Sequence, residues 1–305
     1  MTQPDPLTPG AQPADGRVGP LLVRTRSELT AALAERPAQT GRAYRRCVVM
    51  TMGALHAGHL SLVARARELA TQVVVTIFVN PLQFGAGEDL ERYPRDLAGD
   101  LARLADAGAD IVFAPTSDVV FPAGEPVVRV SAGRLGEVLE GVTRPGHLDG
   151  ALTIVLKLMH LVAPDVAVFG QKDAQQVMAV QAMVRDLDVP VVIVAAPTVR
   201  AADGLALSSR NAFLTPAERE RALVLSRALR AGAVVAREGG DAVRGAAHAA
   251  LDGLEPDYLA LVDPRTADEV PTGYRGQVVL AVAARIGETR LIDNVPLWLG
   301  EEADA

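Results

Sequence analysis

The feature of this sequence that most constrains its fold is an alternation of short β-branched runs with helical patterns. Five runs rich in valine, isoleucine and threonine predict buried strands, at residues 47–51, 72–79, 109–114, 165–169 and 189–195. Between them, the spacing of apolar residues predicts helices at residues 60–70, 94–107, 149–161 and 173–187. Strands that alternate with helices of about ten to fifteen residues indicate βαβ units. We therefore predict an α/β fold with a Rossmann-like parallel sheet that helices cover on both faces.

A second region with a different pattern begins near Asn211. Thr215 and Glu218 form a capping box, which predicts the start of a long helix that ends near Arg237. The remaining sequence predicts one further helix and three strands, at residues 241–251, 257–262, 277–284 and 289–292. We therefore predict two domains after residue 20, a Rossmann-like nucleotide-binding catalytic domain at 21–210 and a small α+β domain at 211–305.

The first twenty residues hold five prolines and few bulky apolar side chains, which predicts a disordered tail at residues 1–20. No apolar run has the length of a membrane-spanning helix, and the tail lacks the apolar core of a secretory signal. The single cysteine, Cys47, excludes an intramolecular disulfide and a multi-cysteine zinc site, so its expected role is strand packing. These observations indicate a cytoplasmic protein without a membrane partner.

The net charge of −7 argues against a surface that collects nucleic-acid phosphates, so we expect no nucleic-acid partner and only small anionic ligands. Positive charge comes almost entirely from arginine, because only two of the 30 basic residues are lysines, Lys157 and Lys172. A lysine ammonium is compact and suits a narrow phosphate pocket, whereas a guanidinium is a broad planar fork. The alternative is that both lysines are remnants of codon bias.

An H-x-G-H motif lies where the first of these strands ends and the next helix begins. Gly58 lets the backbone approach a ligand closely, and the free amides of a helix N-terminus favour phosphate. His56 and His59 can donate hydrogen bonds to phosphate oxygens as negative charge builds on them. The alternative is that His56 is a plain loop residue and His59 an ordinary residue of the first helical turn.

Two other motifs also follow predicted strands. The Leu207-Ser208-Ser209-Arg210-Asn211 segment offers hydroxyls, loop amides and a guanidinium, a set that can clamp a triphosphate, although it can also be a polar connector. The segment FGQKDAQQ, at residues 169–176, places Lys172 at a strand-to-helix turn, where Asp173 can be the helix N-cap. Because ligands of parallel sheets bind beyond the carboxyl ends of the strands, the three motifs together predict a nucleotide site.

These segments together resemble the pantothenate synthetase family, part of the H-I-G-H nucleotidyltransferase superfamily. The resemblance runs from about Leu21 to Asn294 and rests on the order and spacing of six segments, TMGALHAGHLSLV (51–63), IFVNPLQFG (77–85), RYPRDL (92–97), RPGHLDG (144–150), FGQKDAQQ (169–176) and DGLALSSRN (203–211). It implies a ligase that condenses pantoate with β-alanine at the expense of ATP. The pantoate carboxylate would attack the α-phosphate with release of pyrophosphate, and the amine of β-alanine would then displace AMP.

The resemblance also implies the roles of individual residues. His59 is the expected proton donor, and His56 and Lys172 are the other expected catalytic residues. Val199 is expected to reach the adenine edge through its backbone. The expected ATP contacts are Met52, Gly53, Ala54, Leu55, His56, Ala57, Gly58, His59, Gly170, Gln171, Lys172, Asp173, Val199, Leu207, Ser208, Ser209 and Arg210.

Gln83 and Gln176 match the pantoate ligands of the family. An amide side chain both donates and accepts hydrogen bonds, which suits a substrate with a carboxylate and hydroxyls. The alternative for both glutamines is a solvent-facing position. Asn80, Arg144 and His147 are further expected substrate ligands, although Arg144 and His147 can instead brace their loop.

The resemblance alone also implies that magnesium binds together with ATP. It likewise implies that the protein is a homodimer. The sequence departs from the commoner family pattern at Met50, Asp96, Leu148 and Gln171. Gln171 stands where a glutamate is common and so removes one negative charge from the nucleotide loop. The protein ligand of the metal therefore stays open, with Asp100 as the one candidate.

Two other functions fit part of the pattern. An adenylyltransferase that acts on a phosphorylated cofactor precursor also uses H-x-G-H, but it needs extra cationic groups for the acceptor phosphate, and the glutamine pair argues against it. A nucleotide-binding regulatory module without turnover is disfavoured by the presence of both histidines and Lys172. A fused nucleotide kinase is excluded, because the sequence has no G-x-x-x-x-G-K-[ST] motif.

Overall fold

The computed structural model describes residues 19–35, 43–85, 88 and 90–300, so the tail predicted at 1–20 lies almost wholly outside the described residues. The chain forms two compact units. Unit 1 is Met1–Arg129, Thr153–Phe169 and Pro190–Ala196, and unit 2 is Val130–Leu152, Gly170–Val189 and Pro197–Ala305. The units interleave along the chain, whereas the boundary predicted between residues 210 and 211 is a single cut that separates the two sheets. That boundary stays a prediction about domains.

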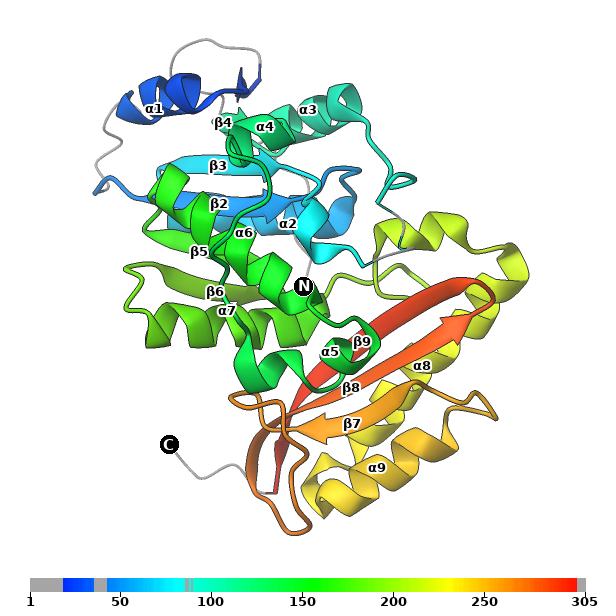
Figure 1. Cartoon of the computed structure of the whole chain (residues 1–305). Helices are drawn as coiled ribbons and strands as arrows, with labels where there is room; N and C mark the ends of the chain where they lie inside the picture. The colour runs from blue at the N-terminus through cyan, green and yellow to red at the C-terminus, as the bar shows by residue number, and fades with distance from the viewer. Residues whose placement is uncertain (1–18, 36–42, 86–87, 89, 301–305) are drawn as a thin grey trace, which may run out of the picture. The chain divides into compact units, whose positions relative to one another are not determined.

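A six-stranded sheet in the order β1-β4-β3-β2-β5-β6 organises unit 1, and every strand pair from β1 to β5 is parallel (Figure 1). This sheet confirms the predicted fold class. The chain leaves β2 toward β3 on one side and later returns to β5 on the other side, so the strand order reverses at β2. The strands are β1 (Leu21–Val23), β2 (Arg46–Thr51), β3 (Gln72–Ile77), β4 (Ile111–Phe113), β5 (Val166–Gly170) and β6 (Val192–Ala196).

Both faces of this sheet are buried at its centre, because the central strands contain runs of successive residues that are buried. Val48 and Val49 are neighbours on β2 that point to opposite faces, and both are fully buried. On one face, Leu62 and Val63 of α2 pack in the same core cluster as Val49. Helix α6 crosses in front of the sheet in Figure 1. The helices of this part of the chain are α1 (Arg26–Ala34), α2 (Ala57–Leu69), α3 (Leu97–Asp106), α4 (Ser117–Val120), α6 (His147–Val162) and the 3₁₀ turn η1 (Pro81–Gln83).

Two elements at the start of the described chain have no counterpart among the predicted ones. The strand β1 is only three residues long and pairs only with β4, so it leaves little periodicity to detect. Helix α1 has a detectable start signal, because the Thr25 hydroxyl accepts a hydrogen bond from the Glu28 amide and the Glu28 carboxylate accepts one from the Thr25 amide. Attention to this capping box would have predicted α1.

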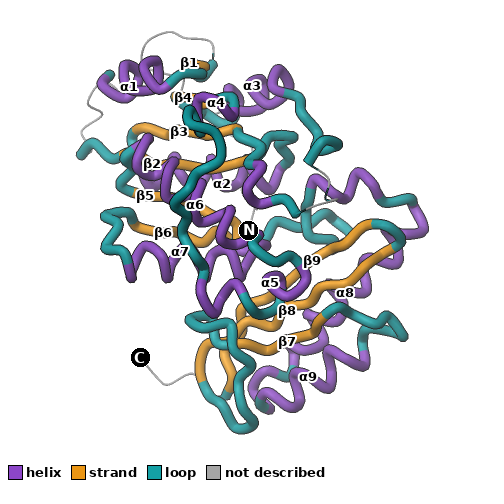
Figure 2. Tube along the Cα trace, in the orientation of Figure 1, coloured by secondary structure: helices purple, strands orange, loops and turns teal. Residues whose placement is uncertain are grey.

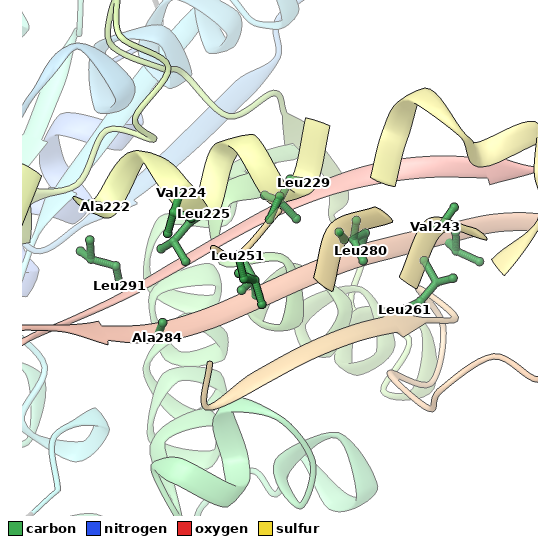
Figure 3. Packing of buried hydrophobic residues seen from close by; sticks show 14 of the residues in the cluster. Ala222, Val224, Leu225, Leu229, Val243, Leu251, Leu261, Leu280, Ala284 and Leu291 are labelled. Atoms are coloured by element: carbon green, nitrogen blue, oxygen red, sulfur yellow. The ribbon is translucent and has the colours of Figure 1, made fainter. Parts of the chain in front are cut away.

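A three-stranded antiparallel sheet in the order β7-β8-β9 forms the centre of unit 2, and the helices α8 and α9 pack on it. Figure 3 shows side chains of α8 and α9 gathered around Leu280 of β8. Figure 2 marks the strands β7, β8 and β9 in orange and the helices α8 and α9 in purple. The elements of this unit are η2 (Gly133–Gly136), α5 (Glu140–Thr143), η3 (Gln171–Asp173), α7 (Ala174–Asp186), η4 (Ser209–Phe213), α8 (Pro216–Val234), η5 (Ala236–Glu238), α9 (Gly240–Ala249), β7 (Tyr258–Val262), β8 (Gly276–Ile286) and β9 (Thr289–Leu299).

The capping box predicted for α8 is confirmed. The Thr215 hydroxyl accepts from the Glu218 amide at 3.3 Å, and the Glu218 carboxylate accepts from the Thr215 amide at 2.8 Å. The predicted end near Arg237 was too late, because α8 ends at Val234 and a 3₁₀ turn follows it. The strand predicted at 289–292 was too short, since β9 continues through Pro296 to Leu299. Proline is tolerated there because β9 is an edge strand, so no neighbour needs its missing N–H group.

Cys47 lies on β2 in the core of unit 1 and is 0% exposed. Burial raises the pKa of its thiol to about 12, so the thiol stays protonated at neutral pH. Its packing role is the one predicted from the sequence. Among the described residues, no helix has both the length and the apolar character needed to cross a membrane.

Candidate active site

The loop that follows β2 is held in an unusual backbone conformation by a buried carboxylate. Gly53 and Ala54 both have positive φ angles, 88° and 51°. The Asp100 carboxylate on α3 accepts the Ala54 amide at 2.9 Å and the Leu55 amide at 2.8 Å. A side chain at position 53 would lie 3.1 Å from the carboxylate, so glycine leaves room for this contact. The backbone of the loop that carries H-x-G-H is therefore held in place by the protein's own contacts.

The same geometry bears on the tentative assignment of Asp100 as a metal ligand. Asp100 is 1% exposed, and both of its oxygens already accept backbone amides, while Arg103 lies 3.4 Å from one of them. In the part of the chain that the structure describes, no group of three His, Cys, Asp or Glu side chains is placed to hold a metal ion. The contacts of Asp100 favour a role in shaping the loop over a role in metal binding.

His56 and His59 cap the N-terminus of α2 reciprocally. The Nδ1 atom of His56 accepts the Gly58 amide at 3.1 Å, and the Nδ1 atom of His59 accepts the His56 amide at 3.3 Å. The centroids of the two rings lie 4.1 Å apart, and the ring planes are tilted by 35°. Because each Nδ1 atom is an acceptor, the neutral rings carry their proton on Nε2. Both imidazoles are therefore fixed as Nε2–H donors at a helix end that favours anions.

Gln83 lies beside the same loop, within unit 1. Its amide nitrogen contacts the Met52 sulfur at 2.9 Å, and its amide oxygen accepts from Asn80 at 3.2 Å. Asn80 is 1% exposed and also caps η1 by accepting the Leu82 amide. Gln83 is half-buried and so is not the solvent-facing residue of the alternative interpretation. Asn80 orients Gln83 next to a predicted ATP contact.

The turn that follows β5 holds Lys172 in unit 2. Asn294 donates from its side-chain nitrogen to the carbonyls of Gln171 and Lys172, at 2.9 and 2.8 Å. Lys172 is partly buried, and its ammonium lies 3.8 Å from the Asp173 carboxylate. Asp173 occupies the N-cap position of α7, as predicted, but its side chain makes no capping hydrogen bond. Gln176, one turn further on, is half-buried.

The Ser-Ser-Arg loop leaves a short hairpin in unit 2. Arg200 and Ala206 form an antiparallel bridge, and the Leu207 amide donates to the Val199 carbonyl at 2.9 Å. The hydroxyl of Ser208 then accepts the Arg210 amide and caps η4. Residues 208–210 are therefore part of a turn with its own cap.

The loop before α6 is braced by a buried ion pair in unit 2. Glu140 accepts from Arg290 at 2.7 and 2.8 Å and from the Tyr258 hydroxyl at 2.9 Å. Burial and the adjacent Glu140 carboxylate raise the pKa of Tyr258 above its usual range, so Tyr258 stays a hydrogen-bond donor. At the end of this loop, Arg144 and His147 lie 3.0 Å apart. This contact supports the bracing role that was the alternative for both residues.

The predicted site residues fall into two groups, one in each unit. Met52 to His59, Asn80 and Gln83 lie around the carboxyl ends of β2 and β3 in unit 1. The second group lies in unit 2 and comprises Gly170 to Asp173, Gln176, Val199, Leu207 to Arg210, Arg144 and His147. The strands that lead into the first and second groups, β2 and β5, are parallel neighbours in one sheet. The assembly of both groups around one nucleotide stays a prediction.

Several residues that hold these groups were not found from the sequence. Gln175 is 6% exposed, accepts the Glu140 amide and donates to the carbonyls of Leu135 and Val138. Its place inside the FGQKDAQQ motif was the available signal. Asp293 and Asn294 gave no signal beyond two adjacent polar residues in an apolar strand.

A sheet whose strand order reverses beside a glycine-containing H-x-G-H loop defines a nucleotide-binding α/β enzyme. Comparison with known proteins gives the particular family. A family model described as pantoate-beta-alanine ligase matches residues 21–296. The chain belongs to this family and is a ligase that joins pantoate to β-alanine, as the resemblance predicted.

Relatives and solved structures agree with this assignment. A pantothenate synthetase of Thermobifida fusca is 56% identical over 92% of this chain and 96% of its own length. A crystal structure of pantothenate synthetase from Thermus thermophilus has a TM-score of 0.82 at 46% identity and covers 90% of this chain and 98% of its own. A pantoate-beta-alanine ligase from Francisella tularensis, solved with beta-gamma ATP and beta-alanine, has a TM-score of 0.73 at 30% identity, with 90% and 97% covered.

Proposed function

We propose that this chain activates pantoate with ATP as an enzyme-bound pantoyl-adenylate and then transfers the pantoyl group to β-alanine. The observation that supports it most directly is the reciprocal capping of His56 and His59, which presents two Nε2–H donors at the N-terminus of α2. A fixed pair of neutral donors suits a reaction in which negative charge grows on phosphate oxygens.

In the first step, a carboxylate oxygen of pantoate forms a bond to the α-phosphorus as the bond to pyrophosphate breaks. His59 donates from Nε2 to the phosphate oxygens, His56 supports it from the adjacent position, and Lys172 neutralises the charge that moves onto the departing pyrophosphate. Gln83 and Gln176 hold the carboxylate and hydroxyls of pantoate. The glycine-rich backbone at Gly53 and Gly58 lets the nucleotide approach closely.

In the second step, the amine of β-alanine attacks the acyl carbon, the nitrogen loses a proton to solvent, and the C–O bond breaks so that AMP leaves with the oxygen and the bonding electron pair. Both nucleophiles belong to the substrates, so the protein supplies positioning and charge compensation instead of its own nucleophile. The Ser208 to Arg210 turn and the Gly170 to Asp173 turn hold the rest of ATP in this proposal. Asn80 orients Gln83, and Arg144 with His147 orders the loop before α6.

Magnesium enters this proposal as part of the substrate, bound to the phosphates of ATP. The described residues do not fit a dedicated protein cage, since Asp100 is committed to backbone amides and no cluster of three ligating side chains exists among them. Magnesium commonly keeps several waters and binds through substrate phosphates with one or two carboxylates. We therefore assign no step to a protein-held metal.

The proposal predicts the fate of the carboxylate oxygens. The chain is mixed with ATP, magnesium, β-alanine and pantoate that carries ¹⁸O in its carboxylate, and AMP is recovered for mass spectrometry. One ¹⁸O atom is expected in AMP, because the oxygen that attacks phosphorus stays with phosphorus when the acyl carbon is released. Without β-alanine, adenylate is expected to remain bound to the enzyme in an amount equal to the enzyme.

Two outcomes would contradict this sequence of steps. AMP without ¹⁸O would exclude attack by the carboxylate on the α-phosphate. An AMP group retained in the final product would instead identify an adenylyltransferase, the rival enzyme class. Pantoate-dependent exchange of labelled pyrophosphate into ATP, measured without β-alanine, is the matched check on the first step.

We further propose, on the family resemblance, that the chain acts as a cytoplasmic homodimer. The expected mass in light scattering after size-exclusion chromatography is that of two chains. A mass of one chain at working concentrations would refute the dimer and leave the reaction steps unaffected.

A further inference from the structure

Two adjacent polar residues interrupt the apolar pattern of β9. Asp293 and Asn294 are each 4% exposed. Because neighbouring side chains of a strand point to opposite faces, burial of both means that the strand is covered on both sides at this point. A buried polar group lowers stability unless it is hydrogen-bonded. The partners of this pair should therefore explain why the sequence keeps them there.

Asn294 is bonded to the Lys172 turn. Its side-chain nitrogen donates to two successive carbonyls, those of Gln171 at 2.9 Å and Lys172 at 2.8 Å. A side-chain amide that donates hydrogen bonds to two consecutive carbonyls restricts the rotation of the backbone between them. The direction in which the Lys172 side chain leaves the turn is therefore set by a residue 122 positions away.

Asp293 is bonded to the hairpin that leads to the Ser-Ser-Arg turn. Its carboxylate accepts from the Arg200 guanidinium at 2.6 and 2.9 Å in a two-pronged arrangement. Arg200 also donates to the Gly204 carbonyl at 3.2 Å, across its own hairpin. Since Arg200 pairs with Ala206, the residue before Leu207, this contact anchors the base of the segment that carries residues 207–210.

We propose that Asp293 and Asn294 are positioning residues that hold the two nucleotide-binding turns of unit 2 in register with each other. The Asn294 backbone amide donates to the Asp293 carboxylate at 2.8 Å, so the two anchors are themselves joined. This inference rests on the proposed function, in which both turns contact ATP. Neither residue touches the substrate, and both act through the turns that do.

Asn294→Asp is the sharpest test, because it preserves volume but replaces the donor with a carboxylate oxygen facing two carbonyl oxygens. We expect the KM for ATP to rise about tenfold, because the unfavourable contact between the new carboxylate and the two carbonyls displaces the Lys172 turn from its place in the ATP site, while the KM for β-alanine stays unchanged. Steady-state kinetics and calorimetric titration with ATP measure this effect. Leu299→Ala is the matched control, since Leu299 is fully buried on the same strand and its loss lowers Tm without touching either turn.

Arg200→Lys is the second variant, and it tests the positioning role of Asp293 even if Asn294→Asp does not fold. It keeps a positive charge beside Asp293 but loses the two-pronged contact, so a several-fold rise in the KM for ATP is expected. Lower Tm with an unchanged KM for ATP would reduce the pair to a purely structural role and overturn the inference. A wild-type enzyme that forms no pantothenate from ATP, pantoate and β-alanine would instead overturn the proposed function.

Discussion

His59→Ala is expected to lower kcat by about 10²–10³-fold, the usual effect of removing one fixed donor to developing negative charge. The Nε2–H group of His59 is held in place because its Nδ1 atom accepts the His56 amide. Two further variants separate the Nε2–H donor of the ring from its Nδ1 acceptor, which caps the helix. His59→Asn keeps an acceptor near Nδ1 and should stay inactive, whereas His59→Gln keeps a donor near Nε2 and should recover part of the rate. AMP release gives kcat, and thermal melting reports the loss of the cap.

His248→Ala is the control for this series, because His248 lies exposed near the end of α9. It should leave kcat unchanged. Near-normal turnover by His59→Ala, or equal activity of the asparagine and glutamine variants, would remove His59 from the chemistry and leave it as a helix cap.

Lys172→Ala is expected to lower kcat by a comparable factor of about 10²–10³, since the variant lacks the ammonium that offsets the negative charge moving onto the departing pyrophosphate. Lys172→Arg should restore little, because a planar guanidinium does not fit the place of a compact ammonium. Addition of a small alkylammonium ion to Lys172→Ala should raise the rate in proportion to its concentration. This rescue is the measurement that separates a missing charge from a displaced turn.

Lys157→Ala is the control that tests whether the loss of kcat is specific to the replacement of Lys172. Lys157 is the only other lysine of the sequence and lies 5.3 Å from the Phe121 ring. Its replacement should cost a little stability and leave kcat near normal. If both lysine variants lost activity equally and neither responded to alkylammonium, the assigned role of Lys172 would be wrong.

The regular part of the fold was readable because buried strands and amphipathic helices leave periodic traces. Five strands of the larger sheet were predicted from runs such as that of β3, and the cap at Thr215 marked the start of α8. The strand β1 was not predicted, because three residues cannot show a period. The end of β9 was not predicted, because Pro296 argues against a strand unless it is known to lie at the edge of the sheet.

The sequence predicted which loops form the candidate site. It did not predict the side chains whose hydrogen bonds hold those loops in place. The three motifs follow strands, so their location could be inferred from topology alone. The contacts of Asp100 with the Ala54 amide, and of Asn294 with the Lys172 carbonyl, join residues far apart in sequence. A side chain that bonds to a backbone group has no required partner residue type. Such contacts therefore cannot be recognised from the residue types at the two positions in a single sequence.

The inert thiol of Cys47 makes this chain convenient for spectroscopy. With an exposed fraction of zero and a pKa of about 12, the native cysteine offers almost no thiolate to maleimide or iodoacetamide reagents. A cysteine introduced at any exposed position would then be the sole reactive thiol. Dyes, spin labels or fluorine tags could report ligand-induced changes in the loops at single positions, with the wild-type core left intact.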